Sequence, residues 1–437
     1  MAKFSVIIVG AGITGLSMAI ALRRKGHDVT VLERHSACQA LGGPVGLSAC
    51  ATRVLIEYGL SDIMTKRAME DLQGANFRRY DTGAILASSN RKKIAEAYGF
   101  PSWVLARFRL QETLAEVATE RGITIKFNSP VLSIDQDRPA VILKDGVEME
   151  ASLIIGADVE GIRAVTRDAI LGETTDPITH FTGYNIDIPR KLLKDDPELS
   201  HLLQQVNAWM GPGQIVFASN MPDHGDKINL CFVTEEKAGQ QGEWYTLGDL
   251  EKLKRTYAHF DVTLRKLLDL ADPKDCYIWR LSQIPPLPNW VSKSGRVVLA
   301  GDSAHAMLPY VGMGASMCVE DSACLAECLE RAESVRDLPK VLHAFEQIRK
   351  PRTEWFVKRG GKMASIWHLP DGEAQEKRDK AWASKPLSLP DMKVWDGKHI
   401  DDPPVEPTVP FHPLINPWTL AFDIFSYTQR RLDQIMV

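Results

Sequence analysis

The chain has 437 residues, 44% hydrophobic and 25% charged, so its length allows two or three domains with a large buried core. A formal net charge of −4 argues against nucleic acid or an anionic membrane as the main partner. Seven cysteines without CxxC spacing, no charged leader and no long apolar run predict reduced thiols, no metal site, no membrane span and a cytoplasmic location.

The first predicted elements are a strand, a glycine turn and a helix. Residues 4–9 form a short apolar, β-branched run, which is typical of a buried parallel strand. Gly10, Gly12 and Gly15 follow, and a helical pattern continues to Gly26. In such a turn the first glycine permits the bend, the second lets the backbone approach a pyrophosphate, and the third lets the helix lie close to the sheet. The start of the helix then offers free N–H groups to phosphates.

A second predicted strand, residues 29–32, ends at Glu33. An acid in this place can accept hydrogen bonds from an adenosine ribose. The strand, turn, helix and acid agree, so they predict a dinucleotide site. The motif alone does not separate NAD from FAD.

Three predicted strands share one feature, because each ends at a glycine beside a polar loop. They are residues 6–9, residues 153–155 before Asp158, and residues 296–300 before Asp302. Ligands of open parallel sheets bind outside the carboxyl ends of the strands. These ends are therefore expected to converge on one cofactor, with another domain inserted between them.

The inserted part has a different pattern. Residues 182–188, 214–219 and 228–234 are extended segments separated by turns, which predicts a mostly antiparallel or mixed sheet. Residues 249–271 have helical periodicity, and residues 72–103 are assigned to the same layer.

The C-terminal third is predicted to be mainly helical. Residues 313–332 form a helix with one apolar face, made of Val319, Ser322, Leu325, Ala326 and Leu329. A second helix over residues 338–363 is predicted to break near Pro351. Nine of the 25 prolines then lie between Pro370 and Pro417, so that stretch is expected to be extended and to wrap a surface. The chain ends with apolar residues at near-helical spacing, which predicts a helix docked on its own core; a dimer or membrane contact is the alternative.

The segment from Gly301 to Ala315 distinguishes FAD from NAD. Asp302 follows a strand, where it can bind sugar hydroxyls, and Gly312 and Gly314 allow backbone N–H groups near a planar ring. The positive end of the next helix suits the anionic N1–C2=O edge of a reduced flavin. The alternative is that these glycines only close a turn.

This segment resembles the GDAAHPMLPYLGQGA block of the single-component, FAD-dependent aromatic hydroxylases, which include salicylate hydroxylase-like enzymes. Further stretches match in the family's order: residues 42–48, residues 105–110, residues 209–213, residues 279–281 and residues 288–290. The resemblance spans about residues 4 to 360. It implies an α/β fold with a Rossmann-like FAD-binding domain, an inserted, mostly antiparallel substrate domain and a C-terminal helical region.

The implied domain bounds are residues 1–71, 104–180 and 285–335 for the FAD-binding domain, residues 72–103 and 181–284 for the substrate sheet, and residues 336–437 for the C-terminal helices and tail. The implied cofactor-binding residues are Gly10, Gly12, Ile13, Thr14, Gly15, Glu33, Arg34, Val45, Gly46, Arg107, Asp158, Asp302, Pro309, Gly312, Gly314 and Ala315.

The resemblance also implies the chemistry. Non-covalent FAD is reduced by NADH or NADPH and reacts with O2 to give a C4a-hydroperoxide, which transfers one oxygen atom to an electron-rich small molecule. A phenol, indole or polyketide of secondary metabolism is the expected type of substrate, and the protein is expected to be a monomer or homodimer. The chain has no second GxGxxG, which agrees with a family that has no separate nicotinamide domain.

Several residues depart from the family pattern. Two residues are inserted between Asp158 and Gly161, which puts the nicotinamide contact in doubt. Ala106, Arg109 and Ala306 replace the family's histidine, acid and proline.

Two residues invite a catalytic role. His305 is interpreted as a structural histidine that fixes a strand-to-helix turn. Tyr184, on a predicted strand of the substrate sheet, is the candidate catalytic residue, with a buried structural tyrosine as the alternative.

Other functions compete with the monooxygenase. The main alternative is an FAD-dependent oxidase or dehydrogenase that transfers no oxygen, and a non-catalytic FAD- or lipid-binding protein is a third class. A flavin halogenase lacks support because the WxWxIP-type signature is absent, and a disulfide reductase lacks its CxxxxC near the first helix.

Overall fold

A computed structural model describes residues 2–38, 43–69, 73–159, 163–221, 225–235, 245–384 and 417–436. Three features predicted above lie partly or wholly outside the described residues. They are Gly42 of the flavin loop, the insertion before Gly161 and most of the proline-rich stretch.

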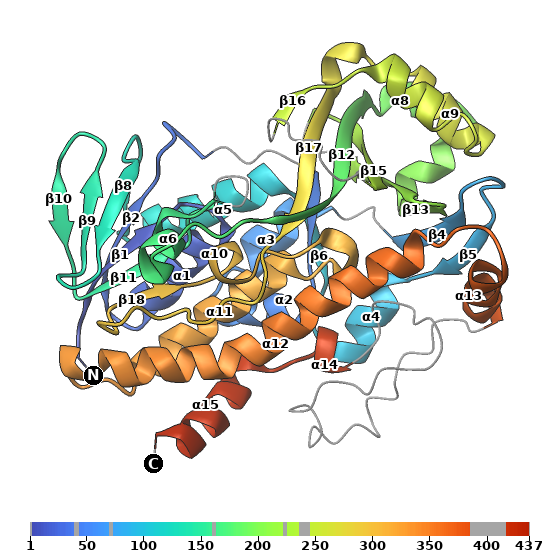
Figure 1. The fold of residues 1–437 in the computed structure, drawn as a ribbon. Coiled ribbons are helices and arrows are strands. Elements are labelled where there is room, and N and C mark those ends of the chain that lie inside the picture. Colours follow the sequence, from blue (N-terminus) through green and yellow to red (C-terminus); the bar gives the residue numbers. More distant parts are fainter. Residues whose placement is uncertain are drawn as a thin grey trace.

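One half of the molecule is built on a five-stranded parallel sheet (Figure 1). Its order is β18 (Val297–Leu299), β11 (Leu153–Gly156), β1 (Ser5–Val9), β2 (Asp28–Leu32) and β7 (Thr124–Lys126). β1, β11 and β18 are apolar and mostly buried, as expected of strands covered on both faces. The three predicted strands therefore lie side by side, with their carboxyl ends at the same edge.

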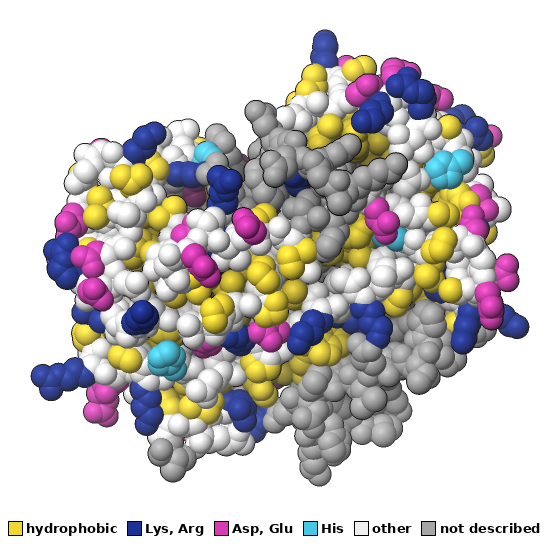
Figure 2. Space-filling model, in the orientation of Figure 1, with side chains coloured by type: hydrophobic (Ala, Val, Ile, Leu, Met, Phe, Trp, Pro, Cys, Tyr) yellow, Lys and Arg dark blue, Asp and Glu magenta, His cyan; other side chains and the backbone are white. Residues whose placement is uncertain are grey.

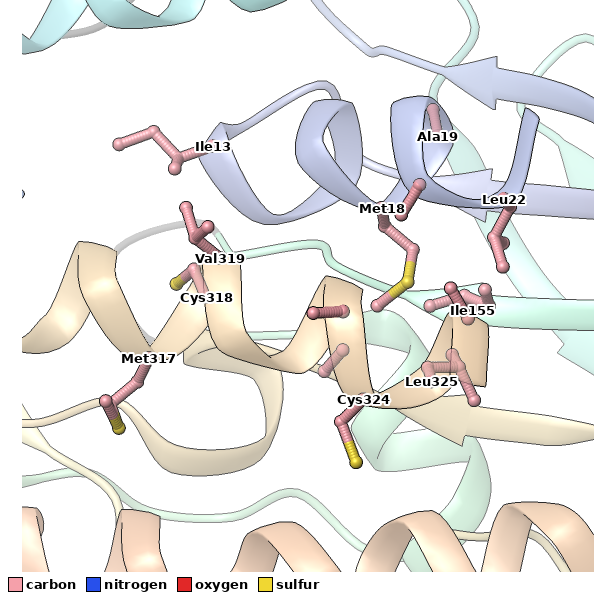
Figure 3. Packing of buried hydrophobic residues seen from close by; sticks show 14 of the residues in the cluster. Ile13, Met18, Ala19, Leu22, Ile155, Met317, Cys318, Val319, Cys324 and Leu325 are labelled. Atoms are coloured by element: carbon pink, nitrogen blue, oxygen red, sulfur yellow. The ribbon is translucent and has the colours of Figure 1, made fainter. Parts of the chain in front are cut away.

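Helices cover this sheet, and two of them pack along each other. Figure 3 shows α1 (Ile13–Arg24) against α11 (Gly314–Leu329), with Met18 and Leu22 turned toward Leu325 and Ile155. The prediction of one apolar face on α11 was too narrow, because every residue from Ser316 to Leu329 is buried. The helix lies between α1 on one side and α12 and α15 on others, so its polar residues are buried too.

The second half is an eight-stranded sheet. Its order is β16 (Tyr245–Leu247), β17 (Cys276–Gln283), β12 (Ile178–Pro189), β15 (Lys227–Glu235), β14 (Gln214–Met221), β13 (Gln205–Gly211), β4 (Gly74–Arg79) and β5 (Ile85–Ser88). All neighbours are antiparallel except β13 and β4, which confirms the predicted mostly antiparallel sheet.

Two helices cover the outer face of this sheet. They are α8 (Leu250–Thr256) and α9 (Val262–Asp269), which replace the single helical stretch expected over residues 249–271. The break has a local cause, because the Asp261 carboxylate accepts a hydrogen bond from the Leu264 N–H and caps a new helix. Leucines of both helices pack with Ile186, Leu230 and Phe232 of the sheet.

Smaller elements complete the two halves. Two further sheets contain β3 (Pro44–Leu47) with β6 (Trp103–Ala106), and β8 (Val131–Asp135), β9 (Ala140–Leu143) and β10 (Glu148–Glu150). The remaining helices before α11 are α2 (Ala49–Glu57), α3 (Ser61–Arg67), α4 (Arg91–Tyr98), α5 (Arg107–Glu120), α6 (Val165–Leu171), α7 (Lys191–Lys194) and α10 (Asp302–His305).

The predicted break at Pro351 was wrong, because α12 runs unbroken from Leu338 to Trp367. Proline removes one backbone hydrogen bond, but buried ion pairs hold the helix on both sides of it. Nη1 of Arg349 and Nη2 of Arg352 each lie 2.7 Å from a carboxylate oxygen of Glu320 on α11. The Thr353 hydroxyl also donates to the Arg349 carbonyl at 3.3 Å.

Near the end of the chain, one helix was not predicted, whereas the packing of the last helix agrees with the prediction. Residues 373–384 form α13 (Glu373–Ser384) where an extended chain was expected; no proline occurs within this stretch. α14 (Pro417–Leu420) and α15 (Ile424–Ile435) follow. Trp418, Phe422 and Leu432 belong to the main hydrophobic core, as predicted.

Candidate functional site

The glycine turn has crowded and open positions. Gly10 has a φ of +102°, and a Cβ there would lie 2.6 Å from the Ala157 carbonyl oxygen, while a Cβ on Gly15 would overlap the Gly10 carbonyl. A Cβ on Gly12 would meet nothing within 4 Å. Gly12 is also the N-cap of α1, and no side chain caps that helix. The turn therefore leaves open space beside uncapped N–H groups, which is the arrangement that binds phosphate.

The side chains of Glu33 and Gln111 form hydrogen bonds with the main chain of the glycine turn. The buried Glu33 carboxylate accepts hydrogen bonds from the Ala11 N–H at 2.9 Å and the His35 N–H at 2.9 Å. Gln111 of α5 donates from Nε2 to the Ala11 carbonyl at 2.7 Å. Arg34, beside Glu33, is exposed. Glu33 thus shapes the loop at the place where a ribose is expected.

The third strand end packs against the first helix. Gly301 has a φ of +62°, and a Cβ there would overlap the Thr14 side chain. Asp302 is the first residue of α10 and is partly buried. The Asp321 carboxylate accepts from the Gly301 N–H at 2.8 Å and lies 2.7 Å from His305 Nε2, so it holds both ends of α10. His305 is buried and packs against Trp290, as expected of a structural histidine.

The loop before α11 leaves a second open region. Pro309 and Gly312 are exposed, and Gly312 has a φ of +63°. A Cβ on Gly312 would meet nothing within 4 Å, and one on Gly314 would meet only Met307, at 4.0 Å. α11 begins here, at Gly314 and Ala315, with no side-chain cap and no acid in its first turn. Its first N–H groups therefore present positive charge toward open space.

β3 and β6 border this region. They are antiparallel, with Val45 opposite Leu105, and a Cβ on Gly46 would meet nothing within 4 Å. The Ser48 hydroxyl lies 2.9 Å from that of Ser316, which ties β3 to the first turn of α11. Arg107 is the first residue of α5, directly after β6, and it is exposed.

Asp158 follows the second strand end. It accepts the Thr166 N–H at 3.1 Å through Oδ2, whereas Oδ1 is buried without a hydrogen-bond partner among the described residues. Burial raises the pKa of this carboxyl group to about 6, although hydrogen bonds from Thr166 oppose the rise. An unpartnered carboxylate oxygen here can accept a hydrogen bond from a ligand.

The buried thiol of Cys318 lies close to three of the predicted cofactor-binding residues. Burial raises the pKa of Cys318 on α11, and the nearby Asp302 carboxylate raises it further. A hydrogen bond with Thr14 and the positive charge of Arg107 act in the opposite direction. Residues from α1, α5, α10 and α11 therefore surround one position at the edge of the parallel sheet.

The eight-stranded sheet turns one face toward this edge. We call it the inner face; its residues Phe181, Val233 and Leu281 pack with Leu308 and Tyr310 of the loop before α11. On the other side, a Cβ on Gly43, before β3, would lie 2.6 Å from Asn229 Oδ1 of β15. The inner face therefore meets both segments that border the open region.

Tyr184 does not lie on the inner face. Its ring packs with the cluster between the sheet and α8 and α9, and it adjoins Cys276 and Ile278 around Gly248. Alternation along β12 explains this, because the register is regular from Phe181 onward and residues three apart point to opposite faces of the sheet. The position agrees with the alternative of a structural tyrosine, so Tyr184 is not carried into the proposals below.

The open positions fit an elongated cofactor with a phosphate-bearing middle and a planar end. They run from the uncapped start of α1 at Gly12, past Asp302 and the orphaned Asp158 oxygen, to Gly46, Gly312 and the start of α11. The described part of the chain contains no cluster of three or more His, Cys, Asp or Glu side chains that could hold a metal ion. None of its helices is long and apolar enough to cross a membrane.

This fold and this edge define an FAD-binding α/β protein. The family model described as "FAD binding domain" matches residues 3–359, so the chain belongs to this family. It is an FAD-dependent monooxygenase of the aromatic-hydroxylase kind, which confirms the resemblance stated from the sequence.

Relatives and solved structures agree. "FAD-dependent monooxygenase ntnJ" of Nectria sp is 32% identical, covering 86% of this chain and 88% of the relative. "Hispidin-3-hydroxylase" of Neonothopanus nambi is 31% identical over 81% and 86%. The fold is similar to CtdE in complex with FAD and substrate (TM-score 0.80, 22% identity, 99% and 98% covered) and to a salicylate hydroxylase substrate complex (TM-score 0.76, 17% identity, 98% and 98% covered).

Sequence reasoning missed several residues that build the site. Gln111, Ser316 and Asp321 are all buried, and each binds a backbone or side-chain group of a cofactor loop. Gln111 was within reach, because it lies one helical turn after Arg107 on the same face of α5. The role of Asp321 could not be predicted from the sequence, because its hydrogen-bond partners, Gly301 and His305, lie 20 and 16 residues before it.

Proposed function

We propose that this monooxygenase consumes NADH or NADPH and transfers one oxygen atom from O2 to an aromatic or other electron-rich small molecule. The observation that carries the proposal is the uncapped start of α11 beside Gly312 and Gly314, facing the inner face of the eight-stranded sheet. A ring bound there would lie between a positive helix end and a largely apolar wall. The names of the relatives, which include hispidin-3-hydroxylase, support a ring substrate.

The proposed FAD contacts divide along the edge. Gly10 to Gly15 and Glu33 with Arg34 hold the adenosine and pyrophosphate part. The flavin and its ribityl chain are bound by Val45, Gly46, Arg107, Asp158, Asp302, Pro309, Gly312, Gly314 and Ala315. On this basis we also propose residues 1–71, 104–180 and 285–335 as the FAD-binding domain, and residues 72–103 and 181–284 as the substrate domain.

Bound FAD supplies the redox chemistry that activates O2. The chain's own residues provide the surroundings. The N–H groups at the start of α11 would stabilise negative charge on a ring bound beside them. The aromatic cluster of Phe181, Tyr310 and Trp367 keeps water from the inner face, since ring centroids of Tyr310 lie 5.6 Å from Phe181 and 5.7 Å from Trp367.

Isolation of the protein with its flavin tests this proposal. We expect a yellow protein that releases FAD on acid precipitation and oxidises NADPH or NADH faster when a suitable ring compound is present. Mass spectrometry after reaction under ¹⁸O₂ should find one labelled atom in the product. Pyridine nucleotide oxidation that yields only hydrogen peroxide with every tested ring compound would contradict oxygen transfer.

A further inference from the structure

The inner face carries polar side chains beside the proposed flavin position. The register of the sheet places Gly183 and Asn185 of β12 opposite Val233 and Cys231 of β15, and Gly183 opposite Trp279 of β17. The indole of Trp279 lies directly on Gly183, because a Cβ there would overlap it. Asn185, Cys231 and Trp279 therefore share the inner face with Val233.

Two polar atoms on this face are buried without partners. Asn185 Oδ1 and Trp279 Nε1 make no hydrogen bond among the described residues. The indole N–H lies beside the Cys231 thiol, a weak acceptor that stays protonated because burial raises its pKa to about 12. Asn185 and Gly183 are two residues apart, so the acceptor and the donor are separated by about 7 Å along the strand. Buried polar atoms without partners are costly, and a bound molecule can satisfy both.

Two cations on the same face, among the described residues, are already paired with acids. Lys227 Nζ lies 3.7 Å from Asp187 Oδ2, and Asp187 also accepts from Asn229 at 2.8 Å. Arg79 of β4 lies within 3.1 Å of Asp81 and also contacts Asp371. A carboxylate on a ligand would meet amides and apolar side chains here, and burial of an unpaired charge is strongly unfavourable.

We propose that the substrate is a neutral ring compound that donates a hydrogen bond to Asn185 Oδ1 and accepts one from Trp279 Nε1. A phenol O–H or ring N–H supplies the donor, and a ring carbonyl supplies the acceptor. The inference rests on the proposed function, because that function puts the ring between this face and the flavin. Ring carboxylates are disfavoured on this face.

Three matched probes test the inference at pH 6.5. They are 7-hydroxycoumarin, 7-methoxycoumarin, which lacks the donor, and 7-hydroxycoumarin-3-carboxylate. Titration of FAD-loaded protein is followed by the visible flavin spectrum and by calorimetry. We expect 7-hydroxycoumarin to bind at least ~10-fold more tightly than either of the other two, which corresponds to about 1.4 kcal/mol.

Variants identify the residues responsible. N185L should remove the preference for 7-hydroxycoumarin over 7-methoxycoumarin, and N185S should reduce it if the leucine variant does not fold. W279F should weaken binding of both coumarins alike. Y184F is the matched control, because it changes the next residue on the opposite face and should leave all three affinities unchanged.

The outcomes separate this inference from the proposed function. Tighter binding of the carboxylate, an unchanged preference in N185L and N185S, or no binding of 7-hydroxycoumarin would overturn the inference. Such a protein would still hold FAD and transfer labelled oxygen to another ring compound. A protein that does not retain FAD, or never transfers oxygen, would instead defeat the proposed function.

Discussion

The two sides of the site are built in different ways. At the edge of the parallel sheet, the proposed cofactor contacts come mainly from main-chain groups, at open glycines and at two helix starts without side-chain caps. On the inner face of the eight-stranded sheet, side chains such as Asn185 and Trp279 provide the polar atoms. Main-chain recognition suits a cofactor that never changes, whereas side chains can be exchanged without disturbing the fold. The comparison predicts that substitutions at the edge act on FAD, and substitutions on the sheet act on substrate choice.

The largest expected effect comes from Gly15→Ala. The new Cβ would overlap the Gly10 carbonyl, so the turn must open. We expect FAD binding to be lost and the free energy of unfolding of the FAD-free protein to fall by about 3 kcal/mol. Denaturant unfolding and FAD fluorescence titration measure the two quantities.

Gly12→Ala is the matched control for that change. A Cβ on Gly12 meets no protein atom within 4 Å, so the FAD-free protein should keep its stability. Its FAD affinity should still fall by about 100-fold, or about 2.7 kcal/mol, because the methyl group occupies space meant for the phosphates. Equal destabilisation of both FAD-free variants would remove the distinction between crowded and open glycines.

Asp302→Ala should have the next largest effect. Loss of a carboxylate that accepts hydrogen bonds from sugar hydroxyls costs about 1.5–3 kcal/mol, which is about 10–150-fold in FAD affinity. Glu96→Ala, on the exposed side of α4, is a control for charge alone and should bind FAD as the wild type does. Wild-type affinity in the Asp302 variant would show that this carboxylate faces something other than the cofactor.

Asp158→Asn should stabilise the FAD-free protein in a pH-dependent way. Burial raises the folded-state pKa of Asp158 from 3.8 to about 6, so the carboxyl group binds its proton more tightly in the folded than in the unfolded chain. The wild type therefore loses stability between about pH 4 and pH 6 as the pH rises, whereas asparagine pays no such penalty. At pH 8 the variant should be more stable by about 2 kcal/mol, and below pH 4 the difference should vanish. Thermal unfolding of both proteins from pH 3.5 to pH 8 measures this difference in stability. A variant that is equally more stable than the wild type at pH 3.5 would contradict the proposed cause.

Tyr184→Phe should have the smallest effect. The hydroxyl lies on the outer face of the sheet, so kcat/KM with any accepted ring compound should change by less than about 2-fold. Unfolding free energy should change by no more than about 0.5 kcal/mol. A loss of kcat above 10-fold would return Tyr184 to the reacting centre.

The strands and the glycine turn at the edge of the parallel sheet were predicted from the sequence because they depend on local signals. Gly10, Gly12 and Gly15 lie within six residues, and Glu33 ends the next strand. The residues of the inner face were harder to predict, because alternation along β12 defines two faces without showing which of them meets the cofactor. Tyr184, the residue predicted to be catalytic, lies on the outer face, whereas its neighbour Asn185 on the inner face was not predicted.

Long-range packing explains the other differences. Pro351 carries a strong local signal to end a helix, yet Arg349 and Arg352 override it through Glu320. Burial alone would raise the pKa of Glu320, but Arg352 and Arg349 lower it overall, so the carboxylate stays ionised. Figure 2 shows a contrasting outer surface, where Lys and Arg lie interspersed with Asp and Glu. Charges of that kind say little about the fold, whereas buried ones decide it.

Arg352 also has a consequence for the order of events during synthesis. Its guanidinium donates to the carbonyl of Trp418 at 2.6 Å and lies 3.8 Å from the ring centroid of Phe422. Those partners come late in the sequence, and the five-stranded sheet is complete only once β18 has been made, nearly three hundred codons after β1. The N-terminal strands therefore cannot complete their sheet until most of the chain has been made, and Arg352 gains its partners at Trp418 and Phe422 later still. Until β18 has been made, the edge that is proposed to bind FAD lacks one of its three adjacent strand ends.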